Sequence, residues 1–168
     1  MSWPGCLLPS DRAQALANDF ALANEEALTF ARSCTDEQWA LTVPGEGWTV
    51  GVVLHHIAES HAQTLRWLGD MTSGRGVSDT AAGIDEVNAA HAERARSVDQ
   101  AKTAALLQVN GTRLEAALRG LNDVELDQNS AFGPAGGRPL PTEQLAAVAA
   151  RHTREHLSHA QGAVAIDS

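Results

Sequence analysis

Apolar residues recur at helical spacing along most of this chain, and no segment shows the sustained apolar–polar alternation typical of a half-buried strand. The pattern predicts helical regions at about 10–33, 49–72, 84–121 and 142–166. We therefore predict an all-α protein in which four helices form a bundle.

Local signals indicate where these helices begin and end. Ser10 precedes an acidic first turn and is a good N-cap residue, whereas the loop 35–47 contains proline and glycines, with a short helical turn at its start. The third region is long enough to need either a kink or a break. Ser97 and the residues after it have the form of a capping box that could start a new helix, and we expect a bend near Ser97. A connection rich in glycine and proline, 122–141, then leads to the last helix.

The inward faces of two helices carry polar residues. In the second helix, the apolar stripe of Val53, Ile57, Thr64, Trp67 and Met71 lies beside His56, Glu59, Ser60 and Gln63. In the last helix, a stripe with steps of four and three runs through Leu145, Ala149, His152, His156, His159 and Ala163. A core-facing imidazole needs a bonding partner, so both faces are candidates for chemistry.

Length and charge narrow the class of protein. At 168 residues the chain is expected to form a single domain, 1–168, with its own hydrophobic core. Its formal net charge of −9 is unfavourable for binding nucleic acid or an anionic membrane surface. Two cysteines, Cys6 and Cys34, imply no disulfide framework, and the opening residues do not resemble a targeting segment, so we expect a cytoplasmic protein.

Histidine spacing predicts a metal centre. Residues four apart share one helix face, so His152 and His156 can direct nitrogens at a common point, and His56 is the natural third ligand. His159 could replace His152 or act behind a ligand. Alternatively, these histidines are core residues whose nitrogens bond to carboxylates such as Glu59 or Glu155. His55 should point away from the centre, and His61 and His91 are expected to be surface or packing residues.

Two segments resemble a known family. The run TDEQWALTVPGEGWTVGVVLHHIAESH and the closing HTREHLSH are similar to the DinB superfamily, and within it to the metal-binding domain of mycothiol-dependent maleylpyruvate isomerases. The segment IDEVNAAHAERARS is similar to the entry of that family's third helix. In the family, a liganding histidine follows the tryptophan at a helix start by eight residues, and Trp48 precedes His56 by that spacing.

The resemblance implies an up-down-down-up bundle in which His56, His152 and His156 bind a divalent ion, zinc or nickel in many members. It also implies mycothiol or a similar thiol as cosubstrate, and a stand-alone member, since the family's isomerases carry a further C-terminal domain. Imidazole ligands by themselves suit zinc, nickel, copper and iron alike.

Two functions follow as hypotheses. One is a metal- and thiol-dependent transferase or isomerase with Glu59 or His159 as proton-transfer residues, although Glu59 could instead orient His56. The other is a non-catalytic metal-binding bundle acting in stress response or protein interaction. A substrate-sized cavity at the metal would favour the enzyme, and a sealed site the second hypothesis. A small thiol or organic substrate is the expected partner, and a homodimer is compatible with a bundle of this size.

Overall fold

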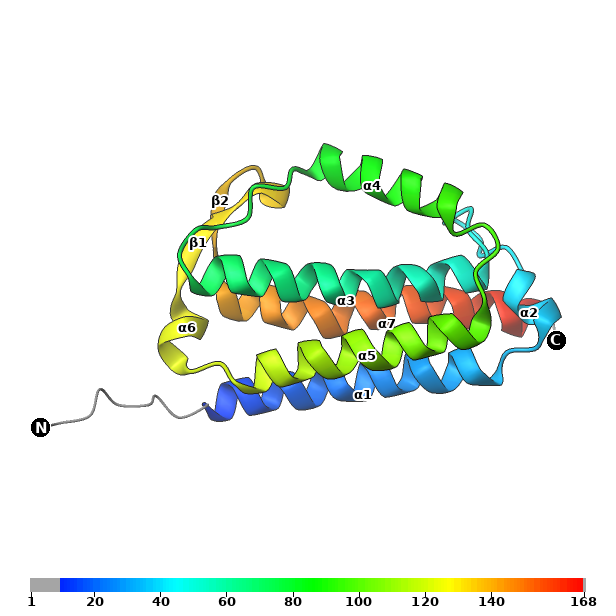
Figure 1. Cartoon of the computed structure of the whole chain (residues 1–168), viewed down its shortest axis with the longest axis horizontal. Helices are drawn as coiled ribbons and strands as arrows, with labels where there is room; N and C mark the ends of the chain where they lie inside the picture. Colours follow the sequence, from blue (N-terminus) through cyan, green and yellow to red (C-terminus); the bar gives the residue numbers. More distant parts are fainter. Residues whose placement is uncertain (1–9, 168) are drawn as a thin grey trace, which may run out of the picture.

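Four long helices form the body of the protein, which we describe from a computed structural model over residues 10–167 (Figure 1). They are α1 (Asp11–Ser33), α3 (Val50–Thr72), α5 (Gln100–Arg119) and α7 (Thr142–Asp167). In Figure 1, α1 and α7 run in one direction along the bundle and α3 and α5 in the other. This is the up-down-down-up order of the predicted fold.

The helix neighbours explain the need for a crossover. Helix α1 packs against α5 and α7, and α3 packs against the same two helices. Because α3 and α5 are parallel neighbours, the chain must return along the bundle between them. Helix α4 (Ala81–Arg94) makes this return and lies over α3, outside the four-helix body (Figure 1).

Short elements close the ends of the bundle. Helix α2 (Asp36–Ala40) precedes α3, and α6 (Asp123–Asp127) follows α5. The connection to α7 contains an antiparallel hairpin of β1 (Asn129–Phe132) and β2 (Arg138–Pro141), joined through the 3₁₀ turn η1 (Gly133–Ala135). The sequence did not predict this hairpin, since strands of four residues are too short to show a period.

The helix boundaries agree with the local signals in most places. The Ser10 hydroxyl accepts a hydrogen bond from the Ala13 backbone N–H, as an N-cap should. The bend expected near Ser97 is a complete break between α4 and α5. The predicted capping box at Ser97 is wrong, because the carboxylate of Asp99 caps α5 and accepts from the Lys102 N–H at 2.7 Å.

The core consists of two apolar clusters, one toward each end of the bundle. One is built around Phe20, Met71 and Leu118, and the other around Leu28, Leu54 and Leu107. Buried polar residues contribute from all four long helices: Asn24, His61, Asn110 and Thr153. The Asn110 amide donates to the Ala58 carbonyl, and the His61 ring bonds to the Thr153 hydroxyl. Two of these buried side chains thus link neighbouring helices, whereas Oδ1 of Asn24 and Nδ1 of His61 have no hydrogen-bond partner among the described residues.

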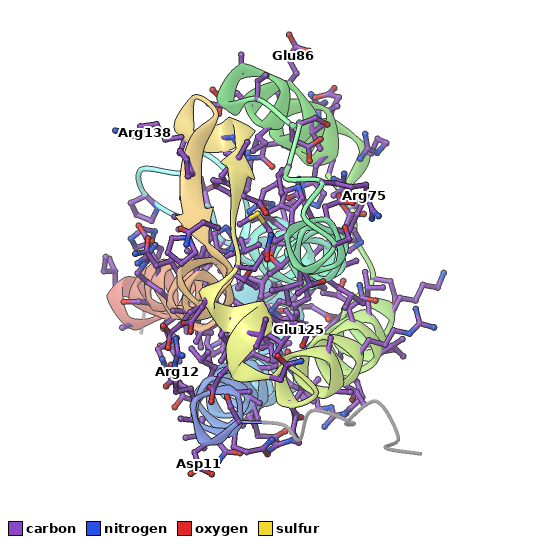
Figure 2. The ribbon with its side chains drawn as sticks, turned by 90° about the vertical axis from the view of Figure 1, so that its left-hand side faces the viewer. Asp11, Arg12, Arg75, Glu86, Glu125 and Arg138 are labelled. Carbon is purple, nitrogen blue, oxygen red and sulfur yellow. The ribbon has the colours of Figure 1, made fainter. Side chains whose placement is uncertain are left out.

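Figure 2 views the bundle from the end that carries the hairpin, where the side chains of Asp11 and Arg138 point outward. Arg12 at the start of α1 pairs with Asp127 and Glu143, which ties α1 to the end of α6 and the start of α7. Of the two cysteines, Cys34 is buried, which raises the pKa of its thiol, and Cys6 lies outside the described residues. None of the helices in the described part of the chain has the length and apolar character needed to span a membrane.

Candidate metal centre

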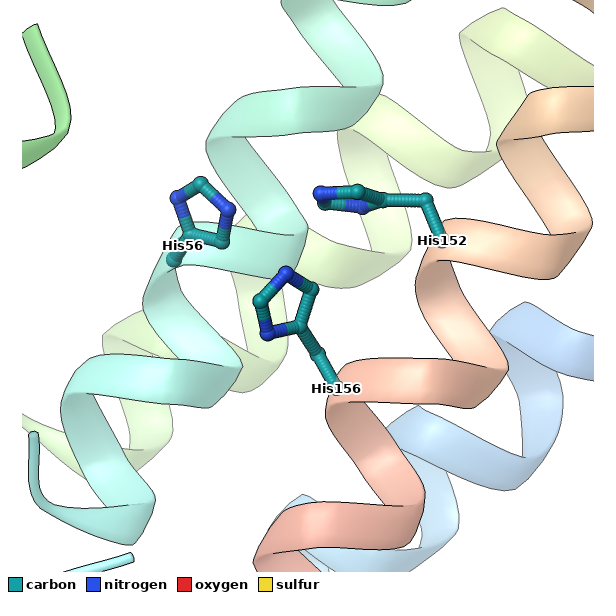
Figure 3. Close-up of side chains that lie close together, drawn as sticks. All are labelled: His56, His152 and His156. Atoms are coloured by element: carbon teal, nitrogen blue, oxygen red, sulfur yellow. The ribbon is translucent and has the colours of Figure 1, made fainter. Parts of the chain in front are cut away.

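Three imidazoles meet in the groove between α3 and α7. His56 comes from the second turn of α3, and His152 and His156 come from successive turns of α7. One nitrogen of each ring lies within 4.8 Å of those of the other two. Figure 3 shows the three rings turned toward one another across the groove. The structure thus brings together the three residues for which the sequence predicted ligation.

Hydrogen bonds orient two of these rings. Nδ1 of His156 lies 3.0 and 3.2 Å from the two carboxylate oxygens of Glu46. A carboxylate accepts, so Nδ1 carries the proton and Nε2 keeps its lone pair. The Ser60 hydroxyl donates to the Ile57 carbonyl, and its oxygen lies 3.4 Å from Nδ1 of His152. In both rings, Nε2 therefore keeps the lone pair that faces the space between the three histidines.

Burial keeps His56 and His152 neutral. Loss of solvent, together with the nearby His152 and His156 rings, lowers the pKa of His56 to about 3. Burial also lowers the pKa of His152 to about 4, with His156 adding to the effect. A neutral imidazole is the form that coordinates a metal, so His56 and His152 are ready for an ion at neutral pH.

Glu46 is the residue at this centre that the sequence did not predict. It lies in the loop between α2 and α3, where the backbone turns at Gly45 and Gly47, both with positive φ. Its carboxylate bonds to His156 and, at 2.7 Å, to Nδ1 of His159. His159 itself is half exposed. It therefore sits behind His156 and contacts the centre through Glu46.

The core stripe predicted for α7 is partly wrong. The fully buried positions in the middle of this helix are Thr153, Leu157 and Ala160. His152 and His156 are only partly buried and His159 is exposed. Helix α7 is rotated so that its larger apolar side chain, Leu157, enters the core, because burying it is favourable whereas burying three imidazoles is costly. The histidines consequently line the groove at the edge of the core.

A second histidine cluster adjoins the first. Nδ1 of His55 lies 2.9 Å from Nε2 of His91, which belongs to α4, and a Glu59 oxygen lies 3.8 Å from the same nitrogen. His91 is buried, so of the two expectations for it, packing is correct. Trp48 contacts the rings of both His56 and His91. Glu59 thus faces His91, and no hydrogen bond joins it to His56 within residues 10–167.

A cavity opens beside His56. It has a volume of about 450 Å³ and lies between α3, α4 and α5. Its lining includes His56, Glu59, Arg66, Asn88, His91 and Asn110. A smaller hollow of about 160 Å³ reaches both His56 and His152. The centre is therefore accessible to a small molecule.

Two arginines near this region are already paired. Arg66, which lines the cavity, forms an ion pair with Asp79 at 2.8 Å. Arg154 on α7 bonds to Asp19 on α1. Arg154 therefore ties α7 to α1, and Arg66 is the arginine placed to meet a molecule in the cavity.

An up-down-down-up bundle with three imidazoles in one groove defines a helical protein of the DinB-like, metal-binding class. The chain belongs to the family of the mycothiol maleylpyruvate isomerase N-terminal domain, whose model matches residues 20–163. The match confirms the family resemblance that the tryptophan and histidine motifs carried.

Comparison with solved structures supports the fold. YfiT from Bacillus subtilis, described as a probable metal-dependent hydrolase with an unusual four-helix bundle topology, superposes with a TM-score of 0.74. The match is 21% identical and covers 96% of this chain and 90% of YfiT. At that identity the likeness concerns the fold. No curated protein matches the chain.

Proposed function

We propose that His56, His152 and His156 bind a divalent ion, zinc or nickel, and that the protein is a metal-dependent transferase or isomerase acting with a low-molecular-weight thiol. The observation that carries this proposal is the cavity of about 450 Å³ that includes His56 in its wall. A purely structural metal site would be sealed by its side chains. The cavity therefore favours an enzyme over the non-catalytic bundle.

The donor set fits such an ion. Three imidazole nitrogens within 4.8 Å of one another match the three protein ligands of many catalytic sites, which keep a further position for water or substrate. Three neutral ligands leave the full positive charge on the ion. A bound divalent ion would supply Lewis-acid chemistry by lowering the pKa of a coordinated thiol or water.

The remaining groups have positioning and proton-transfer roles in this proposal. Glu46 and Ser60 hold the rings of His156 and His152 in the tautomer that directs Nε2 to the centre. Glu59 and His159 were the two candidates for proton transfer. Glu59 lines the cavity beside His56, whereas His159 is bonded to Glu46 outside it. We therefore assign the proton acceptor to Glu59.

The family name supports the choice of a thiol, since mycothiol is the cosubstrate in that name. The description of YfiT as a probable hydrolase suggests water at the same position instead. Both molecules would occupy the open position at the ion. A single domain, a homodimer and a cytoplasmic location remain predictions.

Elemental analysis of the purified protein tests the metal centre. The unmodified chain should contain zinc or nickel, and His56→Ala and His156→Ala should each lose one equivalent while circular dichroism stays helical. Arg151→Ala, an exposed change on α7, serves as a control and should retain the full content. Unchanged metal content in both histidine variants would refute the centre.

The thiol requires a separate measurement. Protein loaded with Co²⁺ should develop a thiolate-to-metal charge-transfer band when mycothiol, or a simple cysteine derivative, is added. This band should be missing in His56→Ala. If the metal is present but no band appears at millimolar thiol, the thiol part of the proposal fails and hydrolysis of small esters or amides becomes the next assay.

A further inference from the structure

The cluster of His55, Glu59 and His91 has the composition of a second metal site. His55 and Glu59 are four residues apart on α3 and share one face, and His91 reaches them from α4. One donor atom from each lies within 4.8 Å of the other two. Two imidazoles and one carboxylate form a donor set known from catalytic zinc sites and from non-haem iron sites.

We propose that His55, Glu59 and His91 bind a second divalent transition-metal ion that joins α4 to α3. A tetrahedral ion with bonds of about 2.0–2.1 Å places its ligand atoms about 3.3 Å apart. The His55–His91 nitrogen separation is 2.9 Å, and the Glu59–His91 separation is 3.8 Å. Adjustments of about half an ångström bring these two separations to that geometry, and the third pair, Glu59 and His55, lies within 4.8 Å.

Proton positions are compatible with binding. Without an ion, Nδ1 of His55 and Nε2 of His91 share one proton, because two facing imidazole nitrogens bond only when one of them donates. Nδ1 of His91 is buried and has no hydrogen-bond partner in the described structure. A change of tautomer in one ring frees both lone pairs for the ion, and no proton needs to leave the protein.

The second site is separate from the three-histidine centre, although the two are close. They share no residue, although the rings of His56 and His91 are in contact, with centroids 5.6 Å apart. His55 and His56 are consecutive on α3 and so point in different directions from the helix. The Trp48 indole contacts both His56 and His91, with ring centroids 5.2 and 5.8 Å apart. The inference therefore does not depend on the proposed function of the first centre.

The packing of α4 indicates what the second ion would do. His91 is the only fully buried residue of this 14-residue helix. Helix α4 also forms one side of the cavity, through Val87, Asn88 and His91. An ion that ties His91 to α3 would hold this wall in place. It would also engage the Glu59 carboxylate, so Glu59 can act as the proton acceptor proposed above only while this second site is empty.

The test uses the full chain with the first centre removed. In the double variant His152→Ala/His156→Ala, calorimetric titration with Zn²⁺ should still show one equivalent bound. Adding Glu59→Gln should abolish that equivalent, whereas adding Glu86→Gln, an exposed change on α4, should not. Hydrogen exchange over 81–94 should slow with Zn²⁺ in the double variant and stay unchanged once Glu59→Gln is added.

Three results would overturn the assignment. They are a double variant that binds no Zn²⁺, an equivalent that survives Glu59→Gln, and bound Zn²⁺ that leaves exchange in α4 unaltered. All of these proteins lack the three-histidine centre, so their results do not depend on it. Whether the three-histidine centre binds metal is tested separately, by the metal content of His56→Ala.

Discussion

Glu46→Gln should weaken metal binding at the three-histidine centre while leaving the three ligands in place. The Glu46 carboxylate is largely buried, with 13% of its side chain exposed, and accepts from Nδ1 of both His156 and His159. Glutamine keeps the shape of the side chain but has one accepting oxygen in place of two and no charge. Oε1 accepts from both rings, so glutamine can keep these contacts only through a neutral, weaker acceptor, and its NH₂ group, a donor, takes the Oε2 position that lies 3.2 Å from Nδ1 of His156.

The expected magnitude follows from this geometry. A carboxylate behind a liganding histidine fixes its tautomer and raises its basicity, and removing such a partner costs about 10–100-fold in metal affinity. This range corresponds to about 1.4–2.7 kcal/mol. His159→Ala should have a smaller effect than Glu46→Gln, because His159 reaches His156 only through the shared carboxylate.

Competition between the protein and a zinc chelator of known affinity measures these constants. Glu25→Gln, an exposed change on α1, is the matched control and should bind zinc like the unmodified chain. Affinity of Glu46→Gln within twofold of the unmodified protein would show that Glu46 does not act on His156. A larger loss in His159→Ala than in Glu46→Gln would instead make His159 a direct ligand.

The remaining predictions concern stability. Burial lowers the pKa of His61 to about 3 from its ordinary 6.5, so the unfolded chain takes up the proton first as pH falls, and stability is lost from pH 6.5 downward. Urea denaturation of chelator-treated protein measures the free energy of unfolding at each pH. Between pH 6.5 and about pH 4.5, this free energy should fall by about 2 kcal/mol less in His61→Gln than in the unmodified chain. Equal losses in the two proteins would contradict this. A Cβ at Gly111 would overlap the Asn24 amide, so Gly111→Ala should lower the free energy of unfolding by about 1–3 kcal/mol. Gly162→Ala, where nothing lies near, should raise it by up to about 1 kcal/mol, and the same sign for both would refute the packing argument.

Much of the fold and half of the site could be predicted because their signals are local. Helical periodicity and caps such as Ser10 depend on residues within one or two turns, so α1, α3 and α7 appear in the sequence where the structure has them, whereas α4 and α5 were predicted as one bent region. The i, i+4 pair of His152 and His156 is equally local. His56 was expected as the third ligand because it lies on the polar inward face of another helix, and the family resemblance implied the same residue.

Other features depend on contacts between distant segments. Glu46 contacts His156 across 110 residues of chain, and His91 contacts His55 across 36. Neither contact produces a repeating pattern in the sequence from which it could be predicted. The same is true of the rotation of α7, which is decided by how well Leu157 fills the core against its neighbours.

The sequence by itself thus determined the helices, the class of protein and the three candidate ligands, because hydrophobic periodicity and histidine spacing act within single helices. Only the tertiary structure decided that Glu46 orients His156, that a cavity adjoins His56 and that His55, Glu59 and His91 meet. These depend on the packing of α4 and of the loop before α3 against the bundle, where the free energy comes from contacts that no local pattern encodes.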